Sequence, residues 1–171
     1  MTAPAPLPIS EPIRPTLVLR PAGISDARLL WEWRNDPVVR ANSFQSEPVA
    51  WKTHLAWLTR KLASPNCRLW IAECGGLPVG QVRYDRDGAL AEVSLSVAAP
   101  FRGRGLGAAL LACSAPCAGR DLQVRRLVAF IKPGNLPSIR AFERAGFRPV
   151  GPHVRAGVPC LAFEYVLDGG D

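Results

Sequence analysis

The sequence predicts an α/β domain of the α+β kind, with a mixed central sheet of about seven strands flanked by about four helices. Strand patterns recur at three successive segments, 68–73, 79–85 and 90–97. Gly75-Gly76 and Asp87-Gly88 lie between them as hairpin turns, which predicts an antiparallel meander. The short apolar segment 127–131 is typical of a buried parallel strand. An antiparallel half and a parallel strand together predict a mixed sheet.

Size and composition indicate one folded domain behind a short tail. The chain has 171 residues, 48% of them hydrophobic, which is enough to bury a core. Residues 1–15 contain five prolines and are expected to form a flexible tail, with a single domain over residues 16–171. The five cysteines form no C-x-x-C pair. We therefore expect reduced thiols, no metal site and a cytoplasmic protein.

The formal net charge of +7 favours an anionic ligand. The arginines are scattered and no aromatic and basic RNA-binding motif is present, so we do not expect a nucleic-acid partner. No stretch approaches the roughly 18 apolar residues that a membrane helix needs. The first residues lack a basic segment followed by an apolar run, so export is not expected either.

The first third of the chain predicts one strand and two helices. Residues 16–20 read as the strand, which Pro21 ends. Ser25 or Asp26 can cap a helix over 27–35, and Pro37 bars its simple continuation. The second helix is predicted over 48–62, with proline in its first turn. Its inner face is predicted from the three- and four-residue spacing of Trp51, Leu55, Leu58 and Leu62.

A glycine-rich turn follows the strand that ends at Val97. Arg102, Gly103, Arg104, Gly105, Leu106 and Gly107 lead into Ala108 and a run of strong helix formers. The first amides of a helix lack intrahelical acceptors and carry partial positive charge, and glycine lets a phosphate approach them. The sequence therefore predicts an anion site here, although a tight turn alone could also account for the glycines.

The spacing of this turn narrows the choice of ligand. A phosphate loop of the Walker type needs Lys and Ser or Thr after its last glycine, where this chain has Ala108 and Ala109. A dinucleotide-binding turn needs G-x-G-x-x-G, which is absent. The pattern R-x-x-G-x-G, by contrast, resembles the acetyl-CoA pyrophosphate loop of the GCN5-related N-acetyltransferases (GNAT). The resemblance implies that the coenzyme is bound by Leu95, Val97 and residues 102–108.

The helix after the turn is predicted to end near Gly119, with an irregular last turn at Pro116. Closing strands are predicted over 147–150 and 162–167. The loop between these strands contains Pro152, Gly157 and Pro159.

A second motif runs from Asn135 to Phe147 and reads N-x-x-S-x-x-x-F-E-x-x-G-F. It resembles the later GNAT motif, whose helix flanks the pantetheine arm. The resemblance implies that Asn135 and Phe142 contact the coenzyme and that Ser138 helps to start the helix near it. Taken by their residue types alone, Asn135 is a turn residue and Ser138 an N-cap.

The resemblance implies direct acetyl transfer to an amine, which needs a group that accepts the amine's proton and a donor for the oxyanion. Glu92 is the predicted base, acting through water, because it shares the face of its strand with Ser94 and Ser96. A solvated strand residue paired with an arginine is the alternative. A backbone amide near Val97 is the expected oxyanion donor. Many relatives have a tyrosine acid where this chain has Phe142. Tyr84, Ser94, Ser96 or water could supply that proton, or the thiolate could leave unassisted.

The first helix contains Trp33-Arg34-Asn35-Asp36-Pro37, which resembles acceptor-site sequences of some GNAT enzymes. By this resemblance Trp33, Asn35 and His54 are expected to contact the acceptor, although packing and capping roles remain open. The closest resemblance is to enzymes that acetylate nucleotide-linked amino sugars, as in pseudaminic-acid synthesis. We therefore expect a small-molecule amine as acceptor and a monomer or homodimer. A protein N-terminus as acceptor, or a non-catalytic module that binds acyl-CoA, remains an alternative.

Overall fold

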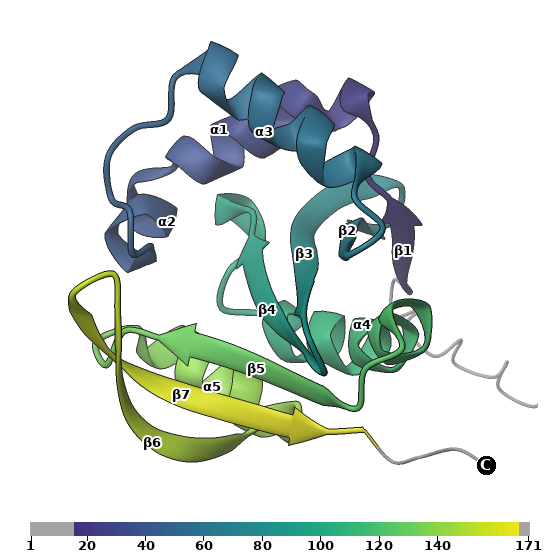
Figure 1. Cartoon of the computed structure of the whole chain (residues 1–171). Helices are drawn as coiled ribbons and strands as arrows, with labels where there is room; N and C mark the ends of the chain where they lie inside the picture. Colours follow the sequence, from purple (N-terminus) through teal and green to yellow (C-terminus); the bar gives the residue numbers. More distant parts are fainter. Residues whose placement is uncertain (1–15, 168–171) are drawn as a thin grey trace, which may run out of the picture.

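A computed structural model describes residues 16–167 as a seven-stranded mixed sheet with helices on both faces (Figure 1). The strands are β1 (Leu17–Pro21), β2 (Cys67–Cys74), β3 (Leu77–Asp87), β4 (Leu90–Val97), β5 (Arg126–Ile131), β6 (Arg148–Arg155) and β7 (Val158–Val166). The α-helices are α1 (Ala27–Asn35), α2 (Pro37–Asn42), α3 (Trp51–Ala63), α4 (Leu106–Leu122) and α5 (Leu136–Arg144). Two short 3-10 helices are η1 (Ile24–Asp26) and η2 (Ala99–Phe101). The predicted fold class is confirmed; the predicted tail lies outside the described residues.

The sheet has the order β1-β2-β3-β4-β5-β7-β6. Strands β1 to β4 form the predicted antiparallel meander, and β5, β7 and β6 pair antiparallel on the other side. The two halves meet where β4 runs parallel to β5, and that pairing covers only residues 90–92 of β4 and 126–128 of β5. Beyond Glu92 the two strands part, as Figure 1 shows. The sheet is therefore split at its centre.

Two hydrophobic clusters hold the layers together. The larger cluster lies between the sheet and the side of α4 and α5, and it includes Trp70, Tyr84, Leu111 and Phe142. The smaller cluster packs α1 and α3 on the opposite face of β2, around Leu58 and Ile71. Successive residues of a strand point to opposite faces. Strand β2 therefore serves both clusters, whereas β1, β3 and β4 contribute to the larger one.

The region between the first two predicted helices differs from the expectation. Pro37 does not simply end a helix: it begins α2, because Asp36 accepts hydrogen bonds from the amides of Val38 and Val39 as N-cap. Helix α3 begins at Trp51, three residues later than predicted at Pro48. Trp51 is exposed, and His54 takes the buried place beside Leu58. The inner face of α3 is therefore rotated from the predicted one.

Helix α4 runs past its predicted end. Gly119 lies within the helix, where a Cβ atom would overlap Leu167 Cδ1, so the glycine allows close packing. The left-handed residue that ends the helix is Gln123, with φ of 53°. Pro116 is accommodated inside the helix. Among the described residues, none of the helices is long and apolar enough to cross a membrane.

The predicted closing loop is instead a long hairpin. Strands β6 and β7 pair from Arg148 to Arg155 and turn at Ala156-Gly157. Pro149 and Pro152 are tolerated because β6 is the edge strand of the sheet. Pro159 lies beyond the part of β7 that pairs with β5, which begins at Leu161. The hairpin tip reaches toward α2 (Figure 1).

Candidate active site

The turn between β4 and α4 leaves backbone amides open at the start of the helix. Gly103 and Gly105 both have φ of 76°, which glycine adopts without strain. A Cβ atom on either glycine would meet nothing within 4 Å. Because Gly105 is the N-cap, the amides of Leu106, Gly107 and Ala108 have no acceptor inside the helix. Open space before free amides at a helix start is suited to binding a phosphate.

The two arginines of this turn have different roles. The Arg102 guanidinium is bonded to other groups of the protein: its Nε donates to Val97 O at 3.0 Å, and its Nη2 pairs with Asp36 Oδ1 at 2.9 Å. This side chain joins the turn to the N-cap of α2. Arg104 is exposed, lies over the ring of Phe101 at 5.7 Å, and forms no ion pair within residues 16–167. Arg104 is therefore the cation of this turn that remains available to an anionic ligand.

Beside the turn, β4 leaves one edge unpaired. From Val93 to Val97 its edge toward β5 has no strand partner, because pairing ends at Glu92. The predicted binding positions Leu95 and Val97 lie on this edge. Gly107 lies close to Leu95 and to α5, since a Cβ atom there would be 3.2 Å from Ala141 Cβ and 3.7 Å from Leu95 Cδ1. The free amides, the unpaired strand edge and α5 therefore lie next to one another.

Glu92, Ser94 and Ser96 share one face of β4, as predicted. Opposite them on β3 lie Asp85, Arg83 and Gln81, respectively. The Glu92 carboxylate is paired with Arg155 Nη2 at 2.6 Å, which links β4 to the tip of the β6–β7 hairpin. Both side chains remain partly exposed, at 30% for Glu92 and 39% for Arg155. Glu92 therefore lies on the strand face predicted for the base, and it also forms the arginine pair that was given as its alternative role.

Arg155 was not predicted as a site residue. Its guanidinium lies 4.8 Å from the ring centroid of Phe130 and 5.9 Å from that of Phe44. The ring of His153 stacks on the ring of Phe130, with 4.9 Å between their centroids. These side chains come from the α2–α3 segment, β5 and the hairpin. No local motif could identify them, because the tertiary fold alone brings the segments together.

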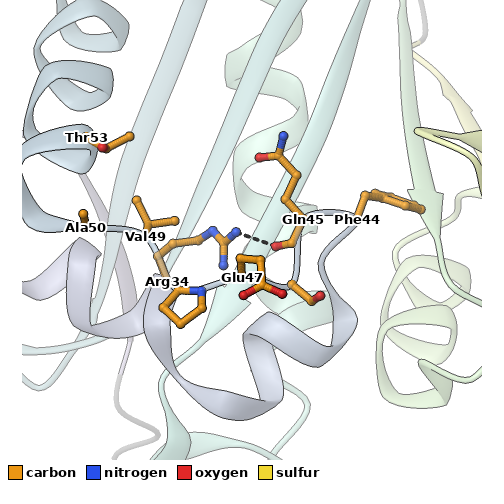
Figure 2. A pocket seen from close by; sticks show the side chains of 9 residues that line it. Arg34, Phe44, Gln45, Glu47, Val49, Ala50 and Thr53 are labelled. Carbon is orange, nitrogen blue, oxygen red and sulfur yellow. Dashed lines mark hydrogen bonds between the residues drawn. The ribbon is translucent and has the colours of Figure 1, made fainter.

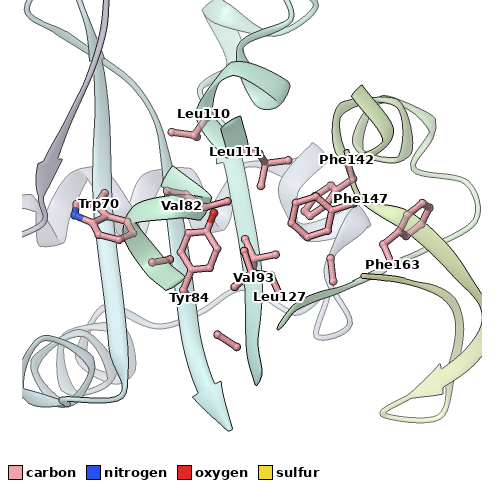
Figure 3. Close-up of a cluster of buried hydrophobic side chains, with 14 of the residues drawn as sticks. Trp70, Val82, Tyr84, Val93, Leu110, Leu111, Leu127, Phe142, Phe147 and Phe163 are labelled. Carbon is pink, nitrogen blue, oxygen red and sulfur yellow. The ribbon is translucent and has the colours of Figure 1, made fainter. Parts of the chain in front are cut away.

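Tyr84 does not lie with Glu92 and Ser94. It pairs with Val93 across the strands and therefore faces the opposite side of the sheet. Its side chain is fully buried, with the hydroxyl 2.7 Å from Ser114 Oγ (Figure 3). Burial raises the pKa of Tyr84 well above its usual range. The predicted acid role of Tyr84 is therefore corrected to a role in the core.

The second predicted motif forms α5. Asn135 is the N-cap, and its Oδ1 accepts the amide of Ser138 at 3.3 Å, so the cap is Asn135 and not Ser138. Phe142 is 3% exposed and packs edge-on against Phe147, with 4.9 Å between centroids (Figure 3). Its side chain supports the helix from the core. Asn135 and Ser138 are both half-buried and lie at the start of α5.

The three residues predicted to contact the acceptor, His54, Asn35 and Trp33, make contacts inside the protein. His54 is 2% exposed and its Nε2 lies 3.0 Å from Ala27 O, so it joins α3 to α1. Burial lowers the pKa of His54. Asn35 bonds both to the amide and to the carbonyl of Val49, at 2.8 and 3.0 Å. Trp33 is half-buried against the smaller cluster. Asn35 therefore fixes Val49 in the segment that leads to α3.

A cavity of about 610 Å³ lies between the end of α1 and the segment leading to α3 (Figure 2). Its lining residues are Arg34, Phe44, Gln45, Ser46, Glu47, Pro48, Val49, Ala50 and Thr53. Arg34 Nη2 donates to Gln45 O at 2.6 Å. Arg34 Nη1 is buried without a partner, the one such side-chain atom in the described part of the chain. An unsatisfied buried donor of this kind costs about 1 to 3 kcal/mol.

Comparison with solved structures shows the fold. Aminoglycoside acetyltransferase AAC(6')-Ib with coenzyme A and kanamycin has 21% identity, a TM-score of 0.77, and coverage of 88% of this chain and 95% of that one. Spermidine N-acetyltransferase from Vibrio cholerae with CoA and spermine has 16% identity, a TM-score of 0.78 and the same coverages. A GNAT-family acetyltransferase from Streptococcus pneumoniae has 17% identity and a TM-score of 0.72, covering 89% and 99%.

The family is shown by sequence. No curated protein matches the chain significantly. The family model for the acetyltransferase (GNAT) domain, however, matches residues 16–148, which is most of the chain. This match includes the glycine turn, the split between β4 and β5, and α5. The chain therefore belongs to the GNAT acetyltransferase family and is an acetyl-CoA-dependent N-acetyltransferase.

Proposed function

We propose that this enzyme acetylates the primary amine of a small molecule, and that a nucleotide-linked amino sugar is the acceptor class. The observation that carries the proposal is the cavity of about 610 Å³. Phe44 lines this cavity and contacts Arg155, which in turn pairs with Glu92. A cavity of this size accommodates a small molecule, and these two contacts link its wall to the proposed base. The similar structures with kanamycin and spermine are further support for a small amine.

The residues of the glycine turn and of the unpaired edge of β4 fit the coenzyme. The amides of Leu106, Gly107 and Ala108 would bind its diphosphate, and Arg104 would add a full positive charge. The unpaired edge of β4 at Leu95 and Val97 would lie along its extended arm. When bound, acetyl-CoA supplies the acetyl group as a thioester. The opening between the strands is the support for this assignment, because backbone amides on a free strand edge can donate to a carbonyl oxygen.

Glu92 is the proposed base. The amine must be neutral before it can attack, and a carboxylate on the polar face of β4 can accept its proton through water. Ser94 lies on the same face and is the proposed hydroxyl for the proton that the sulfur takes up. Phe142 cannot donate a proton, and Tyr84 faces the core. A thiolate is also a stable leaving group near neutral pH, since the pKa of a thiol is about 8.5.

A thiol-release assay with acetyl-CoA tests the acceptor class. We expect the highest kcat/KM with nucleotide-linked amino sugars when these are compared with polyamines, aminoglycosides and peptides. A peptide as the best acceptor would move the assignment to protein N-terminal acetylation. If coenzyme binds and no amine in the panel increases thiol release, the protein is a binding module, which the phenylalanine at position 142 would favour.

A further inference from the structure

Arg34 lies in the last turn of α1 and carries a charge that the described protein does not neutralise. Its Nη2 is bonded to a neutral carbonyl, that of Gln45, and its Nη1 is buried without any partner. No ion pair joins Arg34 to a carboxylate within residues 16–167. Glu47 lines the same cavity without pairing with it. Arg34 and Glu47 thus lie in the wall of the same cavity (Figure 2).

The surroundings of Arg34 add positive charge. Burial, together with the nearby Arg40 and Arg83, lowers the pKa of Arg34. Asp85 compensates Lys61 and Arg83, at 2.6 Å in each case, and Glu47 is the acid among the residues that line the cavity. The ion pairs of the described residues therefore leave the Arg34 guanidinium without a carboxylate partner. A guanidinium with one nitrogen unpartnered is suited to the planar or tetrahedral oxygens of an anion.

We propose that Arg34 binds an anionic group, a phosphate or a carboxylate, that the acceptor amine carries. This inference rests on the proposed function, because it assigns a second group of the same substrate to the same site. The cavity connects to the proposed base through Phe44 and Arg155. An acceptor held by its anion at Arg34 would thus extend its amine toward Glu92.

The test measures anion binding to protein saturated with coenzyme A, so that the glycine turn is already filled. Pyrophosphate and succinate are titrated separately by calorimetry, which distinguishes a phosphate site from a carboxylate site. We expect saturable binding of at least one of them to the wild type and binding at least about tenfold weaker to Arg34→Met. Arg28→Met is the matched control, because Arg28 lies on the same helix but is exposed and pairs with Glu32. This control should bind like the wild type.

A second measurement does not depend on a variant folding. In wild-type assays the bound anion should inhibit competitively against the acceptor amine and not against acetyl-CoA. If neither anion binds to the saturated wild type, or if Arg34→Met binds as tightly as Arg28→Met, the anion site is wrong even when acetylation proceeds. If coenzyme A itself fails to bind in a preceding titration, the proposed function fails instead.

Discussion

At the scale of single residues, Glu92, the proposed base, has Arg155 as its ion-pair partner and would have to exchange this partner for the acceptor amine. The ion pair is short, at 2.6 Å, but both groups remain partly in contact with solvent. Pairs of this kind contribute only about 0 to 1 kcal/mol, so an incoming ammonium can replace the guanidinium. The aromatic rings of Phe44 and Phe130 can hold the Arg155 side chain near its place while the carboxylate is used. The pair therefore orients the carboxylate before the acceptor arrives.

A double-mutant cycle separates catalysis from structure at this pair. If Glu92 is the base, Glu92→Gln lowers kcat by about 100-fold, most strongly at low pH where few amines are neutral. Arg155→Met should change kcat far less, because the base remains. If the pair only anchors the hairpin, both variants and their combination would show equal, small losses across the pH range. Steady-state rates measured as a function of pH decide between these results.

Tyr84→Phe tests the corrected role of the tyrosine. Ser114 gives its proton to Leu110 O, so Tyr84 is the donor in their hydrogen bond. Removing the hydroxyl should lower the free energy of unfolding by about 1 kcal/mol and leave kcat and its pH profile unchanged. Urea unfolding and thiol release measure the two quantities. A large fall in kcat without loss of stability would restore the acid role.

The place of a side chain could be predicted from the sequence only where a local pattern fixes it. Glu92 was correctly placed on one face of its strand with Ser94 and Ser96, because alternation along a strand is a local property. Tyr84, His54 and Asn35 have side chains capable of catalysis or recognition, yet each is bonded inside the protein. Arg34 and Arg155 matter through what lies near them in the fold. Such partners come from distant segments, so a single sequence offers no pattern for them.

At the scale of elements, the start of α4 depends on the left-handed conformation of Gly105. Gly105→Ala puts a Cβ atom into open space but strains the backbone by about 1 to 2 kcal/mol. Relief of that strain should turn the first amides of the helix, so we expect the KM for acetyl-CoA to rise about tenfold. Gly75→Ala is the control, with φ of 60° and equally open surroundings in the β2–β3 turn. It should reduce stability with no change in KM. Equal KM values for both variants would contradict the binding role of the turn.

Elements with a local signal could be predicted, and those decided by tertiary contacts could not. Strand β4 and helix α1 have the predicted bounds because periodicity and turn residues define them. The end of α4 was missed because Gly119 serves packing against Leu167. The two closing strands were predicted, but the outer part of the β6–β7 hairpin was read as a loop, because its prolines are tolerated only at a sheet edge and edge position depends on the strand order.

At the scale of the whole molecule, three contacts join the layer containing α1 and α2 to the rest of the site. Arg102 pairs with Asp36, Lys132 donates to Ala41 O at 2.9 Å, and Arg155 lies over Phe44. They reach this layer from the glycine turn, the end of β5 and the hairpin, respectively. The proposed coenzyme and acceptor regions thus share their supports. A change at one region is expected to alter binding at the other.

The free energy of unfolding should fall at alkaline pH, because buried groups of the central strands then ionise in the unfolded chain. If these strands unfold as one cooperative unit, each such group contributes to the fall. Burial next to Asp85 raises the pKa of the Cys67 thiol from 9.0 to about 11. A raised pKa contributes stability that is fully present below the unfolded value and is lost as pH rises through the folded one. For Cys67 the loss should thus fall between pH 9 and about 11 and amount to about 3 kcal/mol. The pKa of Tyr84, also raised by burial, extends the same trend above pH 10.

Cys67→Ser isolates the thiol's part of this alkaline loss. Urea unfolding at a series of pH values should show a shallower fall in the free energy of unfolding for Cys67→Ser than for the wild type, between pH 9 and about 11. Cys113→Ser should follow the wild-type curve, because Cys113 is exposed. Both substitutions replace a thiol with a hydroxyl, so the difference between them reports burial alone. Parallel curves for all three proteins would mean that the Cys67 thiol ionises without unfolding the sheet, and that β2 can open apart from the rest of the core.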